Sequence, residues 1–319
     1  MTAACVSRRG GESCGVHSYR ISGLSVASQM ELPGAIEAPA NDHAPDITVR
    51  LEAAPAVLAD AIAGGPNWEM AGARVLLRVP RVGRFLIEDG RRIAVELEPG
   101  ATPKDASLFV LGVSFGIVLH QRGAMVLHGS AVARDGAAMA ICGQSGAGKS
   151  TLATALCRAG FAFVADDICA VTLDAEGRPV LPPDGRQLKL WRESIDRLRV
   201  TAEARGPAVR DGFEKYYIGP PSRVAAPPRL TAIYVLRDLR VPFEAGIEAL
   251  NLPDSLRMLD AQAYRAGIRA KLGAPAEKLA QAAAVLGHAK VFIFTRPRGF
   301  DEMDAAVARL TRHWEGLAR

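Results

Sequence analysis

The chain has 319 residues, 49% of them apolar and 6% aromatic, and a formal net charge of +5. This length can hold one large domain or two ordinary ones, and so modest a charge, without an aromatic-rich basic patch, excludes nucleic acid as an expected partner. No apolar run approaches the ~20 residues of a membrane span, and no apolar stretch follows Arg8 and Arg9 as in a secretory signal, so we expect no membrane partner.

The first 107 residues are typical of a polar tail followed by a small β-rich domain. Residues 1–16 are polar and include a Gly-Gly pair, so we expect a disordered tail. Residues 17–107 contain alternating segments that predict strands, at 46–51, 74–79, 83–87 and 92–97. Asp89-Gly90 predicts a tight hairpin turn between the last two. Substrate recognition, oligomer contacts and a plain scaffold all remain open as roles for this domain.

Residues 108–319 are predicted to form an α/β domain, introduced by a buried helix. The apolar segment at 105–120 has an acidic start, which favours that helix. Two strands are then predicted at 125–132 and 137–142, with a turn between them. The next eight residues, Gly-Gln-Ser-Gly-Ala-Gly-Lys-Ser, match G-x-x-x-x-G-K-S and precede a predicted helix at 151–159. This strand–loop–helix order is the context that a phosphate-binding P-loop requires.

The P-loop predicts a nucleoside triphosphate site. Its glycines let backbone N–H groups close around phosphate oxygens at the positive end of the following helix. Lys149 supplies a charge for the β- and γ-phosphates, and the Ser150 hydroxyl can ligate Mg²⁺. A glycine-rich turn without a ligand is the alternative. The predicted ATP-binding residues are Gly143, Ser145, Gly146, Ala147, Gly148, Lys149, Ser150 and Thr151.

Two acids follow the P-loop helix. A short apolar strand at 161–165 ends in Asp166-Asp167, 17 positions after Lys149. One carboxylate can accept the proton of an acceptor hydroxyl, and the other can hold Mg²⁺ directly or through water. The alternative is a strand end capped by solvated acids. His128, on the strand before the P-loop, either pairs with Asp166 and orients it or is a structural histidine.

The rest of the chain supplies further basic candidates. Arg237 and Arg296 follow predicted strands, and in an α/β core ligands gather beyond the carboxyl ends of strands. Either arginine could neutralise charge on a transferring phosphoryl group, and Lys215 could meet a phosphate; solvated or ion-paired side chains are the alternatives. The predicted elements are strands at 168–173, 179–181, 213–218, 230–236 and 291–295, helices at 193–198, 255–272, 276–286 and 301–317, and a polar segment at 202–212.

Five cysteines occur, an odd number, and none are spaced as C-x-x-C. Three of them, Cys142, Cys157 and Cys169, fall on predicted core elements around the P-loop. Buried thiols in a reducing compartment account for them better than disulfides or a zinc site. We therefore expect a cytoplasmic protein.

His128-Gly129, the P-loop and Val164-Ala165-Asp166-Asp167 together resemble the catalytic domain of the HPr kinase/phosphorylase family, which carries these motifs at matching spacings. The resemblance implies a P-loop kinase core of the HPr kinase, PEP carboxykinase-like type that uses ATP and Mg²⁺. It implies Asp166 as the base on a serine hydroxyl, with His128 as its partner, and Ser150 as a Mg²⁺ ligand. Asp167 and Glu193 are the further metal candidates; Glu193 lies near the position of the family's Mg²⁺-binding glutamate, within a different motif.

A closer resemblance, over most of the chain, is to the HPr-kinase-like serine kinases of lasso-peptide biosynthesis clusters. It is carried by Tyr19-Arg20-Ile21-Ser22-Gly23-Leu24, Val82-Gly83-Arg84-Phe85-Leu86, His120-Gln121-Arg122-Gly123 and Leu188-Lys189-Leu190-Trp191. It implies an ATP-dependent kinase acting on a serine of a peptide or protein, with the C-terminal serine of a lasso-peptide precursor as one acceptor. HPr kinases are hexameric, so a homo-oligomer is also implied. Two alternatives stay open: a kinase for free serine or another small alcohol, and a non-catalytic ATP-binding module.

Overall fold

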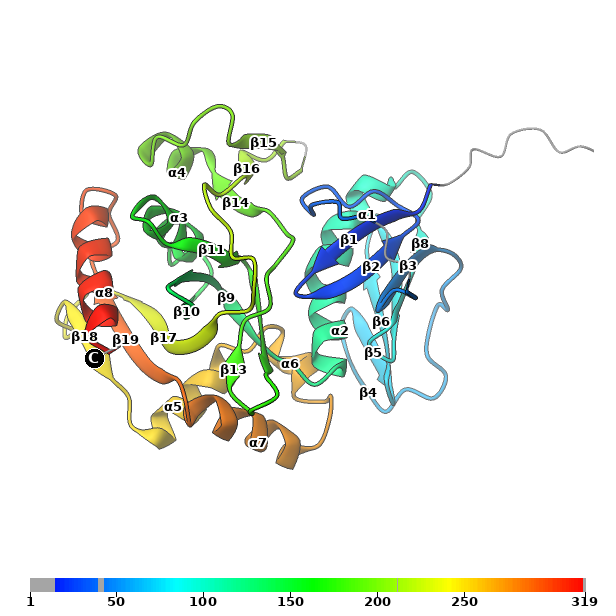
Figure 1. The fold of residues 1–319 in the computed structure, drawn as a ribbon. Helices are drawn as coiled ribbons and strands as arrows, with labels where there is room; N and C mark the ends of the chain where they lie inside the picture. Colours follow the sequence, from blue (N-terminus) through cyan, green and yellow to red (C-terminus); the bar gives the residue numbers. More distant parts are fainter. Residues whose placement is uncertain (1–14, 40–42, 211, 318–319) are drawn as a thin grey trace, which may run out of the picture.

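The chain has a mixed α/β fold, as predicted. The computed structural model describes residues 15–39, 43–210 and 212–317, so most of the predicted tail at 1–16, with Cys5 and Cys14, lies outside the described residues. The described part contains two eight-stranded sheets and one three-stranded sheet. Figure 1 shows the first sheet on one side of helices α1 (Pro103–Phe109) and α2 (Phe115–Gln121), and the second sheet on the other side.

The first sheet is built from the N-terminal strands in the order β1-β2-β3-β8-β7-β6-β5-β4. The four predicted strands are confirmed as β3, β6, β7 and β8. The predicted hairpin turn is present: Asp89 and Gly90 both have positive φ, 52° and 63°, and three residues, Asp89 to Arg91, separate the paired Glu88 and Arg92. β4 and β5, which were not predicted, have only three and four residues, so alternation had few residues to reveal them; β1 and β2 were also not predicted, although they are as long as β3. The bounds are β1 His17–Ile21, β2 Leu24–Ser28, β3 Ile47–Leu51, β4 Ala63–Gly65, β5 Trp68–Ala71, β6 Arg74–Val79, β7 Gly83–Glu88 and β8 Arg92–Leu97.

The predicted buried helix at 105–120 is present as α1, a π-helical segment at Val110–Ser114 and α2. Thr102 and Asp105 form a capping box that begins α1. At Gly116 a Cβ atom would lie 2.6 Å from the ring of Tyr264, so this glycine is required by close packing. The helical segment belongs to one hydrophobic cluster with the first sheet and with residues of the second, which makes it the shared layer between the two sheets.

The second sheet carries the P-loop strand at an inner position. β10 pairs antiparallel with β9 on one side and parallel with β17 on the other, and β17 pairs parallel with β19. The carboxyl ends of β10, β17 and β19 therefore meet at one edge of the sheet. The bounds are β9 Met125–Arg134, β10 Ala137–Cys142, β11 Ala162–Ala165, β12 Ile168–Leu173, β13 Pro179–Val180, β17 Arg229–Asp238, β18 Gly246–Ala249 and β19 Lys290–Arg296.

Helices cover both faces of this sheet. α3 (Lys149–Arg158) and α8 (Met303–Leu317) pack on one face, and α5 (Leu252–Ala261) and α7 (Pro275–Leu286) on the other. The single helix predicted at 255–272 is wrong: it is divided into α5 and α6 (Ala266–Arg269), because Arg265 adopts a left-handed backbone with φ of 51°. No helix within the described ranges is both long and apolar enough to cross a membrane.

A small three-stranded sheet lies above α3, next to helix α4 (Arg192–Arg197) (Figure 1). It consists of β14 (Leu188–Trp191), β15 (Arg205–Ala208) and β16 (Lys215–Ile218), in the order β14-β16-β15. Of these, only β16 was predicted as a strand. The segment at 202–212, predicted only as polar, contains β15, which pairs antiparallel with β16, the next strand along the chain.

A buried ion pair joins the helical layer to the second sheet. Arg186 is 4% exposed, and its Nε lies 2.9 Å from both carboxylate oxygens of Asp184. Its Nη1 donates to the carbonyl oxygen of Leu111 at 3.0 Å, and its Nη2 donates to that of Ile168 at 3.0 Å. One guanidinium thus satisfies backbone acceptors from two separate segments. We infer that it sets how the helical layer sits against the start of β12.

Removing this guanidinium should destabilise the fold strongly, because Asp184 would be left buried and unpaired. We expect Arg186→Met to lower the free energy of unfolding by about 3–5 kcal/mol. The matched control is Arg178→Met, because Arg178 pairs with Asp174 at 2.8 Å but is 40% exposed, and such surface pairs contribute about 0–1 kcal/mol. Urea unfolding measures both. Equal losses in the two variants would contradict a special role for Arg186.

Candidate functional site

A cavity of about 810 Å³ lies at the sheet edge where β10 ends. Its walls come from the loop after β10, the start of α3, the turn after β11, β14 with α4, and the loop after β19. All of the predicted site residues line it except Gly143 and the candidate arginine Arg237. The lining is His128, Ser145 to Thr151, Asp166, Asp167, Lys189 to Trp191, Glu193, Ser194, Arg197, Lys215, Arg296, Arg298 to Asp301 and Met303.

The loop between β10 and α3 is shaped by its glycines. Gly146 and Gly148 have φ of 78° and 85°, a conformation that side chains disfavour. A Cβ atom on Gly148 would also lie 2.8 Å from Nη2 of Arg296. Lys149 is 8% exposed, and its Nζ donates to the carbonyl oxygens of Gly143 and Gln144 at 2.9 and 3.0 Å. Burial lowers the pKa of Lys149. An anion bound by the loop could take the place of these carbonyls.

Asp166 is tied to the P-loop. It is 6% exposed, and its Oδ1 accepts hydrogen bonds from the hydroxyls of Ser150 at 2.8 Å and Ser130 at 2.7 Å. Its Oδ2 accepts from the backbone N–H of Lys189 at 3.2 Å. The carboxylate is therefore held in place from α3, β9 and β14 at once. Such a carboxylate is well placed to share a cation with the Ser150 hydroxyl.

Asp167 contacts His128, whereas the predicted partner of His128 was Asp166. Nδ1 of His128 lies 3.3 Å from Oδ1 and 3.1 Å from the backbone oxygen of Asp167. The reason is strand register: β9 pairs His128 with Ile168 and Ala131 with Ala165. The first acid therefore lies nearest Ser130, and the second lies nearest His128.

The backbone and the charges around Asp167 are both unusual. Its φ is 72°, a left-handed conformation that aspartate tolerates better than most residues. Burial raises the pKa of the Asp167 carboxyl, but the His128 hydrogen bond and the positive charges of Lys189 and Arg186 outweigh it and hold that pKa well below its usual range. The side chain is still 39% exposed, because it faces the cavity. A carboxylate held ionised at the cavity wall can accept a hydrogen bond from a bound hydroxyl.

Lys189 was not predicted as a site residue. It lies between buried Leu188 and Leu190 on β14, so its side chain leaves the strand on the face opposite to theirs. Burial lowers the pKa of Lys189, while the nearby Asp167 charge opposes this effect. The signal in the sequence was a lysine alternating with apolar residues in a strand, but only the folded structure shows that this strand closes over the two acids.

Glu193 lies in the first turn of α4 and lines the same cavity. Within the described ranges, no three His, Cys, Asp or Glu side chains lie close enough together to hold a metal by themselves. This fits Mg²⁺, which is usually bound by one or two protein groups and by substrate phosphates. Ser150 and Asp166 are the pair in direct contact with each other, and Glu193 reaches the cavity from the small sheet's side.

The two candidate arginines differ in position. Arg296 lies against the P-loop, where its Nη2 donates to the Ala147 carbonyl at 3.1 Å. Arg237 instead donates to the Thr295 hydroxyl at 2.8 Å and lines another cavity, so the structure does not bring it to the site. The third basic candidate, Lys215, lines the site cavity, with its Nζ 5.6 Å from the ring centroid of Trp191.

No protein-family model matches the sequence, and no curated protein matches it. Among solved structures, the Hpr(Ser) kinase/phosphatase from Coxiella burnetii matches 61% of this chain and 99% of its own, with 13% sequence identity and a TM-score of 0.33. Its name is that of the family that the sequence motifs resemble. The similarity is weak, and the chemistry of the cavity follows from this chain's own contacts.

The hydrogen bond from Ser130 to Asp166 should stabilise the fold more than an ordinary buried one, since its acceptor is charged. We expect Ser130→Ala to lower the free energy of unfolding by about 1.5–3 kcal/mol. The control is Ser107→Ala, because Ser107 is equally buried but donates to the neutral Lys104 carbonyl at 2.7 Å, a bond that contributes about 0.5–1.5 kcal/mol. Urea unfolding compares them. A loss no larger than that of Ser107→Ala would contradict the expected difference between a carboxylate and a carbonyl acceptor.

Proposed function

We propose that the chain is an ATP-dependent kinase that transfers the γ-phosphoryl group to a hydroxyl. One observation carries the proposal: two adjacent acids at one cavity have different partners, Asp166 with the P-loop hydroxyl of Ser150 and Asp167 with His128. Different environments divide two carboxylates between two roles. A P-loop module that binds a nucleoside triphosphate without transferring phosphate does not need the pair of Asp167 and His128.

The P-loop side binds the nucleotide. The backbone N–H groups at the start of α3 and the ammonium of Lys149 donate hydrogen bonds to the phosphate oxygens. Ser150 and Asp166 would hold Mg²⁺, and Glu193 could complete its shell through water. When bound, Mg²⁺ neutralises negative charge on the phosphates. Arg296 donates a hydrogen bond to the carbonyl oxygen of Ala147 in the P-loop, so it supports the shape of the loop.

The other side activates the acceptor. Asp167 accepts the proton of the hydroxyl, whose oxygen bonds to the γ-phosphorus while the bond from that phosphorus to the β–γ bridging oxygen breaks and ADP leaves. His128 orients the Asp167 carboxylate, and the positive charge of Lys189 favours its ionised form. These roles reverse the expected ones: the base is now Asp167 instead of Asp166, and the acid on the metal side is Asp166 instead of Asp167. A weak base suffices, because positioning dominates in phosphoryl transfer.

The acceptor that we propose is a serine hydroxyl of a peptide or protein, with the C-terminal serine of a lasso-peptide precursor as its most specific form. The resemblance of the sequence motifs supports this choice. Exposed Trp191, 52% accessible, lies on the rim of the cavity next to Lys215, where a polypeptide acceptor could make contact. The buried free thiols of Cys142, Cys157 and Cys169 support a cytoplasmic location, and the same resemblance supports a homo-oligomer.

Asp167→Asn should abolish transfer while leaving nucleotide binding intact. We expect turnover to fall by about 10²–10⁴-fold, with the Kd for Mg-ATP unchanged, because asparagine also tolerates the left-handed backbone. Asp166→Asn should weaken Mg-ATP binding itself. Calorimetry and a turnover assay separate the two effects.

The matched control is Asp135→Asn, which makes the same substitution at another left-handed aspartate, with φ of 53°, in an exposed turn. It should change neither quantity. Normal turnover in Asp167→Asn, with loss of turnover at unchanged Mg-ATP affinity in Asp166→Asn, would return the base role to Asp166.

The acceptor class can be read from transfer of label from radioactive ATP. We expect labelling of a peptide that ends in serine, sensitive to EDTA and restored by Mg²⁺, and little labelling of free serine. Peptides with an internal serine, or with an amidated C-terminus, test whether the terminal position matters. Labelling of free serine alone would indicate a small-molecule kinase. ATP binding without a labelled product from any acceptor would indicate a non-catalytic module.

A further inference from the structure

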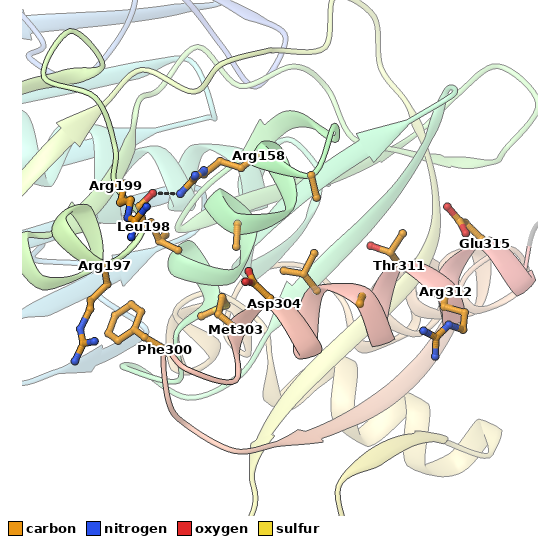
Figure 2. Close-up of a pocket in the computed structure, with 14 residues that line it drawn as sticks. Arg158, Arg197, Leu198, Arg199, Phe300, Met303, Asp304, Thr311, Arg312 and Glu315 are labelled. Atoms are coloured by element: carbon orange, nitrogen blue, oxygen red, sulfur yellow. Dashed lines mark hydrogen bonds between the residues drawn. The ribbon is translucent and has the colours of Figure 1, made fainter.

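A second cavity, of about 910 Å³, runs between α3 and α8. Figure 2 shows Arg197 and Phe300 close together at one end of it and Glu315 at the other. Three of its lining residues, Arg197, Phe300 and Met303, also line the P-loop cavity. These side chains therefore stand where the two cavities meet.

Sheet order fixes the direction in which a bound triphosphate would extend. β10 lies between β9, which carries His128, and β17, which in turn pairs along its length with β19. If the terminal phosphate faces Asp167 on the β9 side, the rest of the nucleotide must leave the P-loop toward the β17–β19 side. The segment found there is the loop after β19, at residues 297–302.

That loop is held directly against the P-loop. Nη2 of Arg298 donates to the carbonyl oxygen of Gly146 at 2.7 Å, and Nη1 lies 3.4 Å from a carboxylate oxygen of Asp238 at the end of β17. Phe300 follows two residues later and is half-buried in the wall of the P-loop cavity. An aromatic ring is thus presented beside the P-loop, on the side away from the acids.

Arg197 comes to this ring from the last turn of α4. Its guanidinium carbon lies 5.8 Å from the ring centroid of Phe300, and its Nη1 lies 3.9 Å from Asp301. The Arg197 side chain is 58% exposed and its ion pair with Asp301 is long, so neither contact holds the guanidinium in a fixed position. A flat apolar ring and a planar cation thus face the same space from different walls.

We infer that Phe300 and Arg197 bind the nucleoside of the triphosphate, with the base against the Phe300 ring and the Arg197 guanidinium. Aromatic rings and guanidinium planes are the protein groups that stack on bases. The inference rests on the proposed function, since it requires a triphosphate in the P-loop. In this arrangement, Phe300 and Arg197 are the residues that make the site bind a nucleoside triphosphate more tightly than a bare polyphosphate.

The test compares the binding of Mg-ATP with that of Mg-tripolyphosphate, which has the phosphates without the nucleoside. We expect Phe300→Ala to weaken ATP binding about tenfold, the effect typical of losing one base–aromatic stack, and to leave tripolyphosphate binding unchanged. Phe300→Leu, which keeps the apolar packing of the loop, should weaken ATP binding in the same direction. Arg197→Ala should also act on ATP alone.

The matched control is Phe213→Ala. Phe213 is 50% exposed, has Arg210 over its ring at 5.6 Å, and is not among the lining residues of the cavity. It should change neither affinity. Equal weakening of both ligands by the Phe300 variants, or no weakening of ATP, would overturn the inference and leave the proposed function standing. A wild-type protein that binds neither ligand would remove the proposed function, and the inference with it.

Discussion

The carboxylate of Asp166, shared between the hydroxyls of Ser130 and Ser150, is the contact on which the arrangement of the site depends. It connects β9 to the start of α3, so it ties the P-loop to the turn that carries both acids. Because β9 pairs with β10, β11 and β12, a single strand sets the position of the P-loop, of the turn that carries both acids, and of His128. The chemistry of the cavity is thus a consequence of one strand's register.

β9 is packed against by residues from outside the α/β core. The helical layer between the two large sheets shares a hydrophobic cluster with the N-terminal strands and with residues of β9 and β12. Arg186 adds polar contacts to it, reaching Leu111 in the π-helical segment and Ile168 directly after Asp167. The N-terminal sheet therefore supports the site indirectly, through the hydrophobic cluster that it shares with β9 and β12. Among the described residues, none from that sheet lines the site cavity.

The cavity has two chemically distinct ends. Acids, His128 and Lys189 lie on the β9 side, while arginines and Phe300 lie by the loop after β19. A linear triphosphate placed between these ends has one end suited to proton transfer and the other suited to a flat aromatic group. The small sheet with α4 lies over both, and the 3.1 Å contact between the Thr151 and Ser194 hydroxyls joins it to α3.

Local sequence determined the P-loop and the strand and helix around it, because a short glycine pattern needs only its neighbours along the chain. It also determined the hairpin at Asp89-Gly90 and the long strands of both large sheets, since alternation and turn chemistry are local. Only the tertiary structure decided which acid meets His128, that Lys189 closes over the acids, that Arg296 reaches the P-loop while Arg237 does not, and that Phe300 stands beside Arg197. Each of these depends on strand register or on segments distant in the chain, and a one-residue change of register exchanges the partners of neighbouring side chains.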